Sequence, residues 1–268
     1  MSAVETFEVS LPDGTLKTLP AGSTSLDLAQ GIGSRLAKAA VAAVVDGVET
    51  DLTVALAAGA KVSIITAESE AGRHVLRHST AHVMAQAVVQ LFVGAKFTIG
   101  PAIEDGFYYD FALPNNATFS DDDLASIEIR MREIMKSNQP FTRSEVSAEE
   151  ALAVFSLQPY KCEIIERVTS GAADGSDAAE VGDGGSVSLY RNSDEFVDLC
   201  RGPHLPSTKH IPAFKLMRTA AAYWRGSEKN PMLQRIYGTA WPSQDELNAH
   251  LELLAEAEKR DHRRLGTE

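Results

Sequence analysis

Two turn signals near the N-terminus constrain the fold of this chain more than any other feature. Pro12-Asp13-Gly14 separates two short extended runs, and Asp46-Gly47 follows the apolar run 40–45. Such residues favour tight turns between neighbouring antiparallel strands. A Ser/Thr cap signal marks a short helix between the two turns, and a last alternating run, 61–66, closes the segment. Residues 1–65 therefore predict a small α+β domain of the β-grasp type.

The composition narrows the class of protein. Hydrophobic residues make up 44% of the 268, and 37 acidic against 25 basic residues give a formal net charge of −12. This apolar content excludes disorder as the main state, and no apolar run approaches the roughly 18 residues that a membrane span needs. The N-terminus lacks a signal-peptide pattern and two cysteines make no disulfide framework, so we expect a cytoplasmic protein with no membrane partner. The acidic charge argues against a non-specific nucleic-acid coat protein.

The rest of the chain predicts a larger α/β domain, residues 74–242, with helices packed on a mainly antiparallel sheet. Residues 66–73 are polar and read as a linker, and 243–268 as a polar connector helix. The expected elements are helices over about 74–92 and 120–136, a shorter helix capped by Ser147, a mobile Gly/Ala/Asp-rich loop over 170–186 and several short strands between 187 and 241.

Two histidines mark the first long helix. His78 and His82 are four residues apart, so both imidazoles lie on one helix face, within reach of one small ion or substrate. Taken alone, such a pair is more often packed and hydrogen-bonded near a core than part of a site. His74, one turn earlier, has no apolar partner before it, and we expect it to be exposed.

A second motif, Cys200-Arg-Gly-Pro-His204, supplies the matching chemistry. Pro203 makes a regular helix interior improbable, so a loop is expected. Together with the histidine pair, Cys200 and His204 complete four ligands of the types that zinc prefers, which favours one shared site. The alternative is that Cys200 is simply a small buried hydrophobe.

Asp198 and Lys161 extend the candidate set. Asp198 precedes Cys200 by two residues, and in an extended segment both side chains point to the same side. A carboxylate there could orient a histidine or hold an amino group. Lys161 lies beside an apolar segment; a surface position is the default for lysine, but partial burial would allow a role in proton transfer.

The region from Phe196 to Gly238 has the opposite charge to the whole chain. Seven basic residues stand against two acidic ones, a net charge of +5. Tyr223 and Trp224 lie among them, which suits a phosphate-bearing, base-stacking ligand such as an RNA 3′ end. The alternative is an ordinary mixed surface. The sequence has neither GxxxxGK[ST] nor GxGxxG, so nucleoside triphosphate chemistry is not expected within it.

Several strings in this order resemble the editing domain of bacterial threonyl-tRNA synthetases. They are His78-Ser-Thr-Ala-His82, Ile99-Gly-Pro101, Gly106-Phe-Tyr-Tyr-Asp110 and Asp198-Leu-Cys-Arg-Gly-Pro-His204. Residues 1–65 resemble the TGS domain, a ubiquitin-like β-grasp unit at the same place in that family. The resemblance covers nearly the whole chain, and Lys259-Arg-Asp-His-Arg263 resembles the segment that leads into the family's aminoacylation domain.

The resemblance implies post-transfer proofreading, that is, hydrolysis of the serine wrongly attached to the 3′ end of tRNA(Thr). A pocket that admits serine and excludes threonine by clash would be its basis. His78 would act as base or water-positioner, Lys161 would move a proton or stabilise negative charge, and the remaining catalytic candidates, His82, Cys200 and His204, would line the serine pocket. The substrate-binding candidates are Asp198 for the α-ammonium group, Tyr109 with the Gly100 and Pro101 backbone for the terminal adenosine, and Arg201.

Cofactors and partners follow from the same resemblance. No cofactor is favoured for editing, and zinc held by His78, His82, Cys200 and His204 is the alternative. ATP and another zinc ion would serve only a C-terminal aminoacylation domain, in a commonly homodimeric protein that attaches threonine to tRNA(Thr). We therefore expect a piece of that longer protein in preference to a freestanding editing protein. The competing functions are a non-catalytic tRNA-docking module and a freestanding zinc-dependent esterase.

Overall fold

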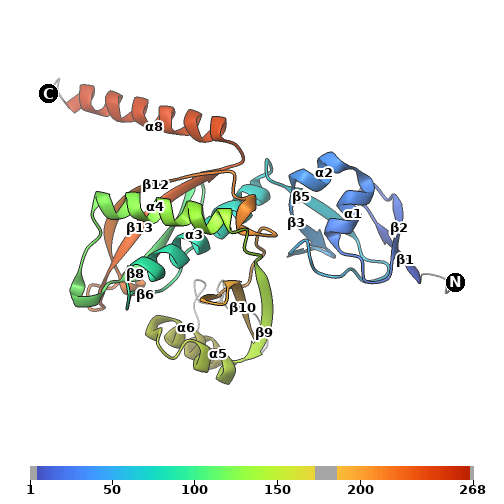
Figure 1. Cartoon of the computed structure of the whole chain (residues 1–268), viewed down its shortest axis with the longest axis horizontal. Helices are drawn as coiled ribbons and strands as arrows, with labels where there is room; N and C mark the ends of the chain where they lie inside the picture. The colour runs from blue at the N-terminus through green and yellow to red at the C-terminus, as the bar shows by residue number, and fades with distance from the viewer. Residues whose placement is uncertain (1–4, 173–185, 266–268) are drawn as a thin grey trace.

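The computed structural model describes residues 5–172 and 186–265, with side chains up to Arg260. Most of the loop expected over 170–186 thus lies outside the described residues. The N-terminal unit lies to one side of the larger domain, and the C-terminal helix α8 (Gln244–Leu265) projects from that domain (Figure 1). Ser243 caps α8 by accepting the Glu246 N–H.

The N-terminal unit confirms the β-grasp prediction. It consists of the hairpin β1 (Thr6–Ser10) and β2 (Leu16–Pro20), the helices α1 (Ser25–Ile32) and α2 (Ser34–Ala39), and the antiparallel sheet β4 (Val48–Thr50), β3 (Ala40–Val45) and β5 (Val62–Thr66). A parallel bridge between Ser10 and Lys61 sets the hairpin beside β5. Thr24 caps α1 in a capping box with Asp27, and the turn at Asp46-Gly47 has positive φ at both residues.

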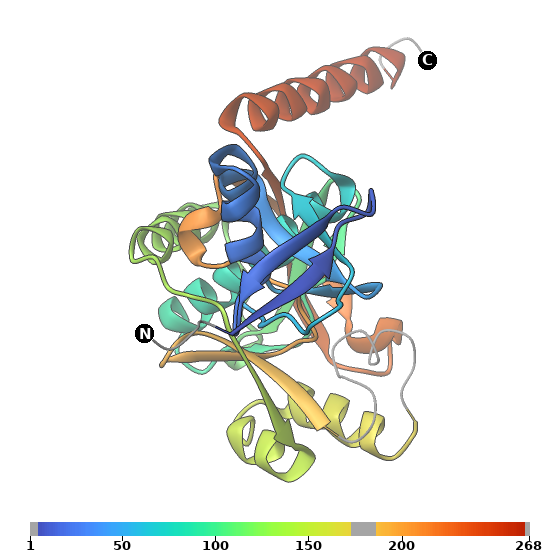
Figure 2. The same cartoon turned by 90° about the vertical axis from the view of Figure 1, so that its right-hand side faces the viewer.

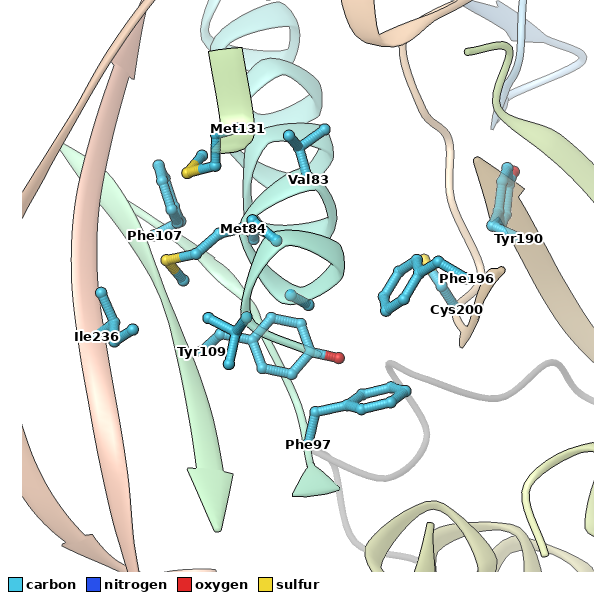
Figure 3. Packing of buried hydrophobic residues seen from close by; sticks show 14 of the residues in the cluster. Val83, Met84, Phe97, Phe107, Tyr109, Met131, Tyr190, Phe196, Cys200 and Ile236 are labelled. Atoms are coloured by element: carbon cyan, nitrogen blue, oxygen red, sulfur yellow. The ribbon is translucent and has the colours of Figure 1, made fainter. Parts of the chain in front are cut away.

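The main sheet of the larger domain is antiparallel. Its strand order is β12 (Ala213–Tyr223), β13 (Met232–Trp241), β8 (Gly106–Ala112) and β6 (Lys96–Phe97), with β7 (Ala102–Ile103) also paired to β8. The helices α3 (Glu70–Leu91) and α4 (Asp121–Lys136) pack against it. Figure 3 shows how Met84 of α3 meets Phe107 of β8 and Ile236 of β13 in the core. Helices on a mainly antiparallel sheet are what the sequence predicts.

A smaller sheet lies at the other end of the larger domain from α8 (Figure 2). Its antiparallel order is β11 (Phe196–Leu199), β10 (Ser186–Ser193) and β9 (Thr142–Ser147), and it is accompanied by α5 (Ala148–Val154) and α6 (Pro159–Thr169). Within the described residues there are also three short 3-10 helices: η1 (Pro114–Asn116), η2 (Thr208–His210) and η3 (Trp224–Gly226). The caps expected at Ser120 and Ser147 are both formed, each as a capping box.

Two local expectations are corrected. The first long helix begins at Glu70 and not near His74, because the Ser69 hydroxyl accepts the Gly72 N–H and caps it one turn earlier. The segment expected as a linker is therefore partly helical. In addition, β12 and β13 are not short: they have 11 and 10 residues and pair along almost their full length. Among the described helices, none is both long enough and apolar enough to cross a bilayer.

Candidate functional site

The structure brings the two distant motifs together. His78 and His82 project from α3, and Cys200 and His204 lie on the irregular loop after β11. His78 Nε2 is 2.8 Å from Cys200 Sγ, which is 3.4 Å from His204 Nε2. One donor atom from each of the four side chains lies within 4.8 Å of the others. The cluster therefore has the donors and the spacing to hold a metal ion, or to surround a small reacting group.

Burial controls the charge of the three imidazoles. His82 and His204 are 2% and 1% exposed, whereas His78 is partly exposed and offers the open side of the cluster. Desolvation, followed by repulsion from neighbouring groups, lowers the pKa of His78 and of His82 to about 3 and that of His204 well below its ordinary value. All three rings are therefore neutral at pH 7, and each keeps a lone pair for a proton or a metal ion. His74, as expected, is exposed.

A buried ion pair lies beside the cluster. Lys161 of α6 is fully buried, and its Nζ lies 2.7 Å from Oδ1 of Asp198, which is 1% exposed. The same oxygen accepts the Leu199 N–H, while Oδ2 accepts the Tyr109 hydroxyl at 2.6 Å and lies 3.4 Å from His82 Nε2. Asp198 thus connects the lysine to the histidine cluster. A surface position was the default expectation for Lys161 and partial burial the alternative; its burial is complete.

The other substrate-binding candidates surround the same region. Tyr109 is 1% exposed, and Figure 3 shows its hydroxyl directed away from the sheet, toward the side on which Cys200 lies. A Cβ at Gly100 would overlap the Tyr109 ring, so only glycine lets this backbone pass so close. The Gly100 backbone also hydrogen-bonds the His78 ring. Pro101 is partly buried, and Arg201 is exposed on the loop between Cys200 and His204.

Further side chains that were not among the sequence-based candidates also contact His204. Ser79 Oγ lies 3.0 Å from His204 Nδ1, and the Phe141 ring stacks on the imidazole at 4.8 Å. Asp51, from the N-terminal unit, accepts the His204 backbone N–H at 2.8 Å, and burial raises the pKa of this carboxyl. Only Ser79 carried a signal, since it lies between the paired histidines; Asp51 and Phe141 belong to no chemical motif in the sequence.

The basic stretch is less available to a ligand than its composition suggests. Lys215, Arg225 and Arg235 form ion pairs with Glu128, Glu163 and Asp110, each at 2.7 Å. Trp224 is only 6% exposed and donates its Nε1–H to Glu163, so it is not a surface for stacking a base. Its place in a stacking surface, expected from the sequence, is therefore corrected.

The four donors suit zinc in type, but one of their separations is too short for it. Three imidazoles and one thiol are ligands of the types found in zinc sites. His82 Nδ1 is buried and has no hydrogen-bond partner among the described residues, which a coordinated ion would remedy. The 2.8 Å between His78 Nε2 and Cys200 Sγ is, however, shorter than the about 3.5 Å that nitrogen and sulfur ligands keep around a tetrahedral zinc ion. The residues fit zinc once this pair moves apart.

Comparison with known proteins finds two family matches in the chain. Residues 7–66 match the TGS domain, and residues 187–237 match the threonyl and alanyl tRNA synthetase second additional domain. The chain is 51% identical over 263 residues to a threonine–tRNA ligase of Acidithiobacillus ferrooxidans, covering 97% of this chain and 38% of the relative. A ligase of Streptomyces avermitilis is 52% identical over 258 residues (94% and 38%), and one of Thermobifida fusca 51% over 275 (100% and 40%). The chain thus spans about 38–40% of the length of these relatives.

Proposed function

Because the chain belongs to the threonine–tRNA ligase family and corresponds to its N-terminal TGS and editing region, we propose that it hydrolyses the seryl ester of mischarged tRNA(Thr). The observation that carries this proposal is the convergence of His78, Cys200 and His204 into one cluster beside the buried Lys161–Asp198 pair. Ester hydrolysis needs an activated water, stabilisation of a tetrahedral oxyanion, and a proton for the leaving ribose oxygen. Candidate residues for these tasks lie in the cluster and in the Lys161–Asp198 pair beside it.

We assign the activation or positioning of the attacking water to His78. It is the one partly exposed member of the cluster, and its lowered pKa keeps the ring neutral and able to accept a proton, directly or through the ribose hydroxyl. A hydrogen bond to the Gly100 backbone raises the pKa of this ring slightly against the effect of burial. His82, Cys200 and His204 line the pocket that takes the serine side chain. Threonine carries one more methyl group, which a closely fitting pocket rejects by clash, as the second sieve of a double-sieve system does.

Lys161 is assigned to the oxyanion or to the leaving-group proton. Its ammonium group is held by Asp198 next to His82, so its charge acts in surroundings from which water is excluded. The α-ammonium group of the substrate is assigned to Asp198. Both carboxylate oxygens already accept hydrogen bonds, so an incoming ammonium group replaces one of these donors. Tyr109, the Gly100 and Pro101 backbone and Arg201 remain the candidates for the terminal adenosine and its phosphate.

We propose that this reaction is metal-independent. The short separation of His78 and Cys200 supports a direct imidazole–thiol contact in place of two ligands of one ion. If zinc binds, the same four side chains hold it, and it supplies an activated water. Elemental analysis of chelator-free protein decides between the two: stoichiometric zinc would make His78 a ligand and remove its assignment as base.

A deacylation assay on Ser-tRNA(Thr) tests the function. His78→Ala is expected to lower the rate at least about 100-fold, the typical contribution of a positioned acid or base. Cys200→Ala is also expected to lower the rate, because it removes part of the serine pocket and the side chain that contacts His78. His74→Ala is the matched control, because it removes an exposed histidine one turn earlier on the same helix. Full activity in both site variants would overturn the proposed site. Binding of tRNA without hydrolysis by the unaltered protein would instead indicate a docking module.

The zinc-dependent esterase is the second candidate, and the four-donor cluster is the observation that favours it. Such an enzyme would cleave a small seryl ester as well as seryl-tRNA, whereas the proposed editing function requires the tRNA. The wider setting is proposed from the family resemblance of the sequence: a cytoplasmic, commonly dimeric protein, whose aminoacylation domain uses ATP and its own zinc to attach threonine to tRNA(Thr). The names of the relatives, threonine–tRNA ligases, agree with the ligase part of this proposal.

A further inference from the structure

Asp51 joins the N-terminal unit to the loop that carries Cys200 and His204. It follows β4, and its side chain is 8% exposed. Oδ1 accepts the backbone N–H of His204 at 2.8 Å, and Oδ2 accepts the hydroxyl of Tyr190 at 2.8 Å. Both partners belong to the larger domain. One side chain of the TGS unit therefore contacts the candidate site directly.

The loop is held from two directions at consecutive residues. Asp51 accepts the N–H of His204, and Ser79 of α3 accepts the N–H of Leu205 at 3.0 Å. Ser79 Oγ also lies 3.0 Å from Nδ1 of the His204 ring. Because each anchor comes from a different unit of the molecule, the loss of either lets the backbone shift toward the other. Such a shift would move the imidazole relative to Cys200 Sγ.

Tyr190 packs against the loop on the side away from α3 (Figure 3). Its ring lies 4.4 Å from that of His204, and Figure 3 shows it on the far side of Cys200 from α3. Gly202 has a φ of 75°, and a Cβ there would overlap the Tyr190 hydroxyl, so the loop passes directly over this ring. The Gly202 N–H in turn donates to Cys200 Sγ at 3.1 Å. Asp51, by fixing the hydroxyl, also fixes the surface on which the loop rests.

The N-terminal unit is packed firmly enough to hold Asp51 in place. Val41 and Ala42 of β3 and Ile65 of β5 are buried in the core cluster of the larger domain and not in that of their own unit. At the start of α3, a Cβ on Gly72 would overlap the Thr66 carbonyl, so helix and strand meet without a gap. The unit therefore acts as a fixed part of the structure around the site.

The chemistry of Asp51 is unusual for a purely structural link. A buried carboxylate is costly to desolvate; among the described residues Asp51 is in no salt bridge, and attraction to Arg143 only partly offsets the rise in its pKa that burial causes. Two hydrogen bonds to the carboxylate offset this cost, and both end on the loop or on its support. We infer that Asp51 is a positioning residue for the editing reaction, through which the TGS unit sets the place of His204. This inference rests on the proposed function for its kinetic consequence.

Deacylation kinetics with Ser-tRNA(Thr) test the inference. Asp51→Ala is expected to lower kcat about 10- to 100-fold with KM unchanged, since small misplacements of catalytic groups have effects of this size. Asp51→Asn keeps an acceptor for the His204 N–H and is expected to recover most of the rate. Glu49→Gln is the control, because it removes an exposed carboxylate two residues earlier. A folded Asp51→Ala protein with normal kcat would overturn the inference. If Asp51→Ala does not fold, the single variant Tyr190→Phe replaces it: it is expected to lower kcat by less than about 10-fold and by more than Asp51→Asn does. A normal kcat in Tyr190→Phe would then overturn the inference.

An NMR measurement separates this inference from the proposed function. The ring signals of His204, assigned by comparison with His204→Gln, are expected to shift in Asp51→Ala and not in Glu49→Gln. Unshifted signals in folded Asp51→Ala would contradict the positioning role whatever the activity. If the signals shift but the unaltered protein does not hydrolyse Ser-tRNA(Thr), the positioning of the loop stands and the proposed function falls.

Discussion

Two lysine–carboxylate pairs have the same separation and very different surroundings. Beside the candidate site, Lys161 lies 2.7 Å from Asp198, and both side chains are almost completely buried, at 0% and 1% exposed. Where α4 meets β12, Lys215 lies 2.7 Å from Glu128, but the lysine is 47% exposed. Water screens the second pair and not the first, so equal distances imply unequal energies. The distance between the charged atoms therefore does not distinguish the two pairs; their burial does.

The largest expected effect is on the buried pair. Lys161→Met leaves the Asp198 carboxylate buried without its cation, and we expect a loss of about 3–5 kcal/mol in the free energy of unfolding, measured by urea denaturation. A loss below about 1 kcal/mol would mean that the pair is hydrated in solution and would remove the contrast.

A double variant separates charge from packing at the same place. Lys161→Met with Asp198→Asn removes both charges, so it is expected to be more stable than Lys161→Met alone, because no unpaired charge remains buried. The coupling free energy from the double-mutant cycle reports the interaction itself. Additive effects of the two substitutions would contradict a direct pairing.

Arg235 and Asp110 lie between the two extremes of burial. Arg235 is 24% exposed, binds both carboxylate oxygens, at 2.7 and 2.8 Å, and lies over the Tyr108 ring at 3.8 Å. Arg235→Lys keeps the charge but loses the planar two-point contact, so we expect a loss of about 1–2 kcal/mol in unfolding experiments. A change as large as that of Lys161→Met would show that burial does not order these pairs.

The exposed pair sets the lower end of the scale. In Lys215→Met, Glu128 keeps the Leu216 N–H and Arg132 as partners. The expected loss is about 0–1 kcal/mol, and added salt should reduce it further. A loss that is unchanged by salt would indicate that this pair, too, is shielded from water.

The sequence predicts the members of the site better than their connections. Helical spacing puts His78 and His82 on one face, and the loop with Cys200 and His204 follows from its proline, because these signals are local in the chain. The complete burial of Lys161 was not predictable, since it depends on how α6 packs against β6, which lies far from it in the chain, and against α5, which lies beside it. The contact of Asp51 with His204 joins residues 153 positions apart, and no local pattern encodes it.

In the fold, too, local features were predictable and long-range packing was not. The caps at Ser120 and Ser147 and the turn at Asp46-Gly47 were predictable, because a cap or a tight turn is specified by the few residues that form it. The packing of Val41 and Ile65 against the larger domain was not, because an apolar strand residue does not reveal which of two cores it will join.

The smallest expected effect extends the contrast to histidines. Within the site, desolvation lowers the pKa of His82 to about 3; in η2, the exposed His210 has a pKa that partial desolvation also lowers, opposed by a hydrogen bond to the Ser207 backbone. The unfolded chain then binds more protons than the folded one below pH 6.5, so His210 should reduce stability as the pH falls from its ordinary pKa through the lowered one. His210→Asn should therefore lose less stability than the unaltered protein between pH 7.5 and 5, and the His210 ring signal should titrate below 6.5 by NMR. Titration at or above 6.5 would mean that water reaches this ring fully, and that burial separates the two histidines even more sharply than the structure indicates.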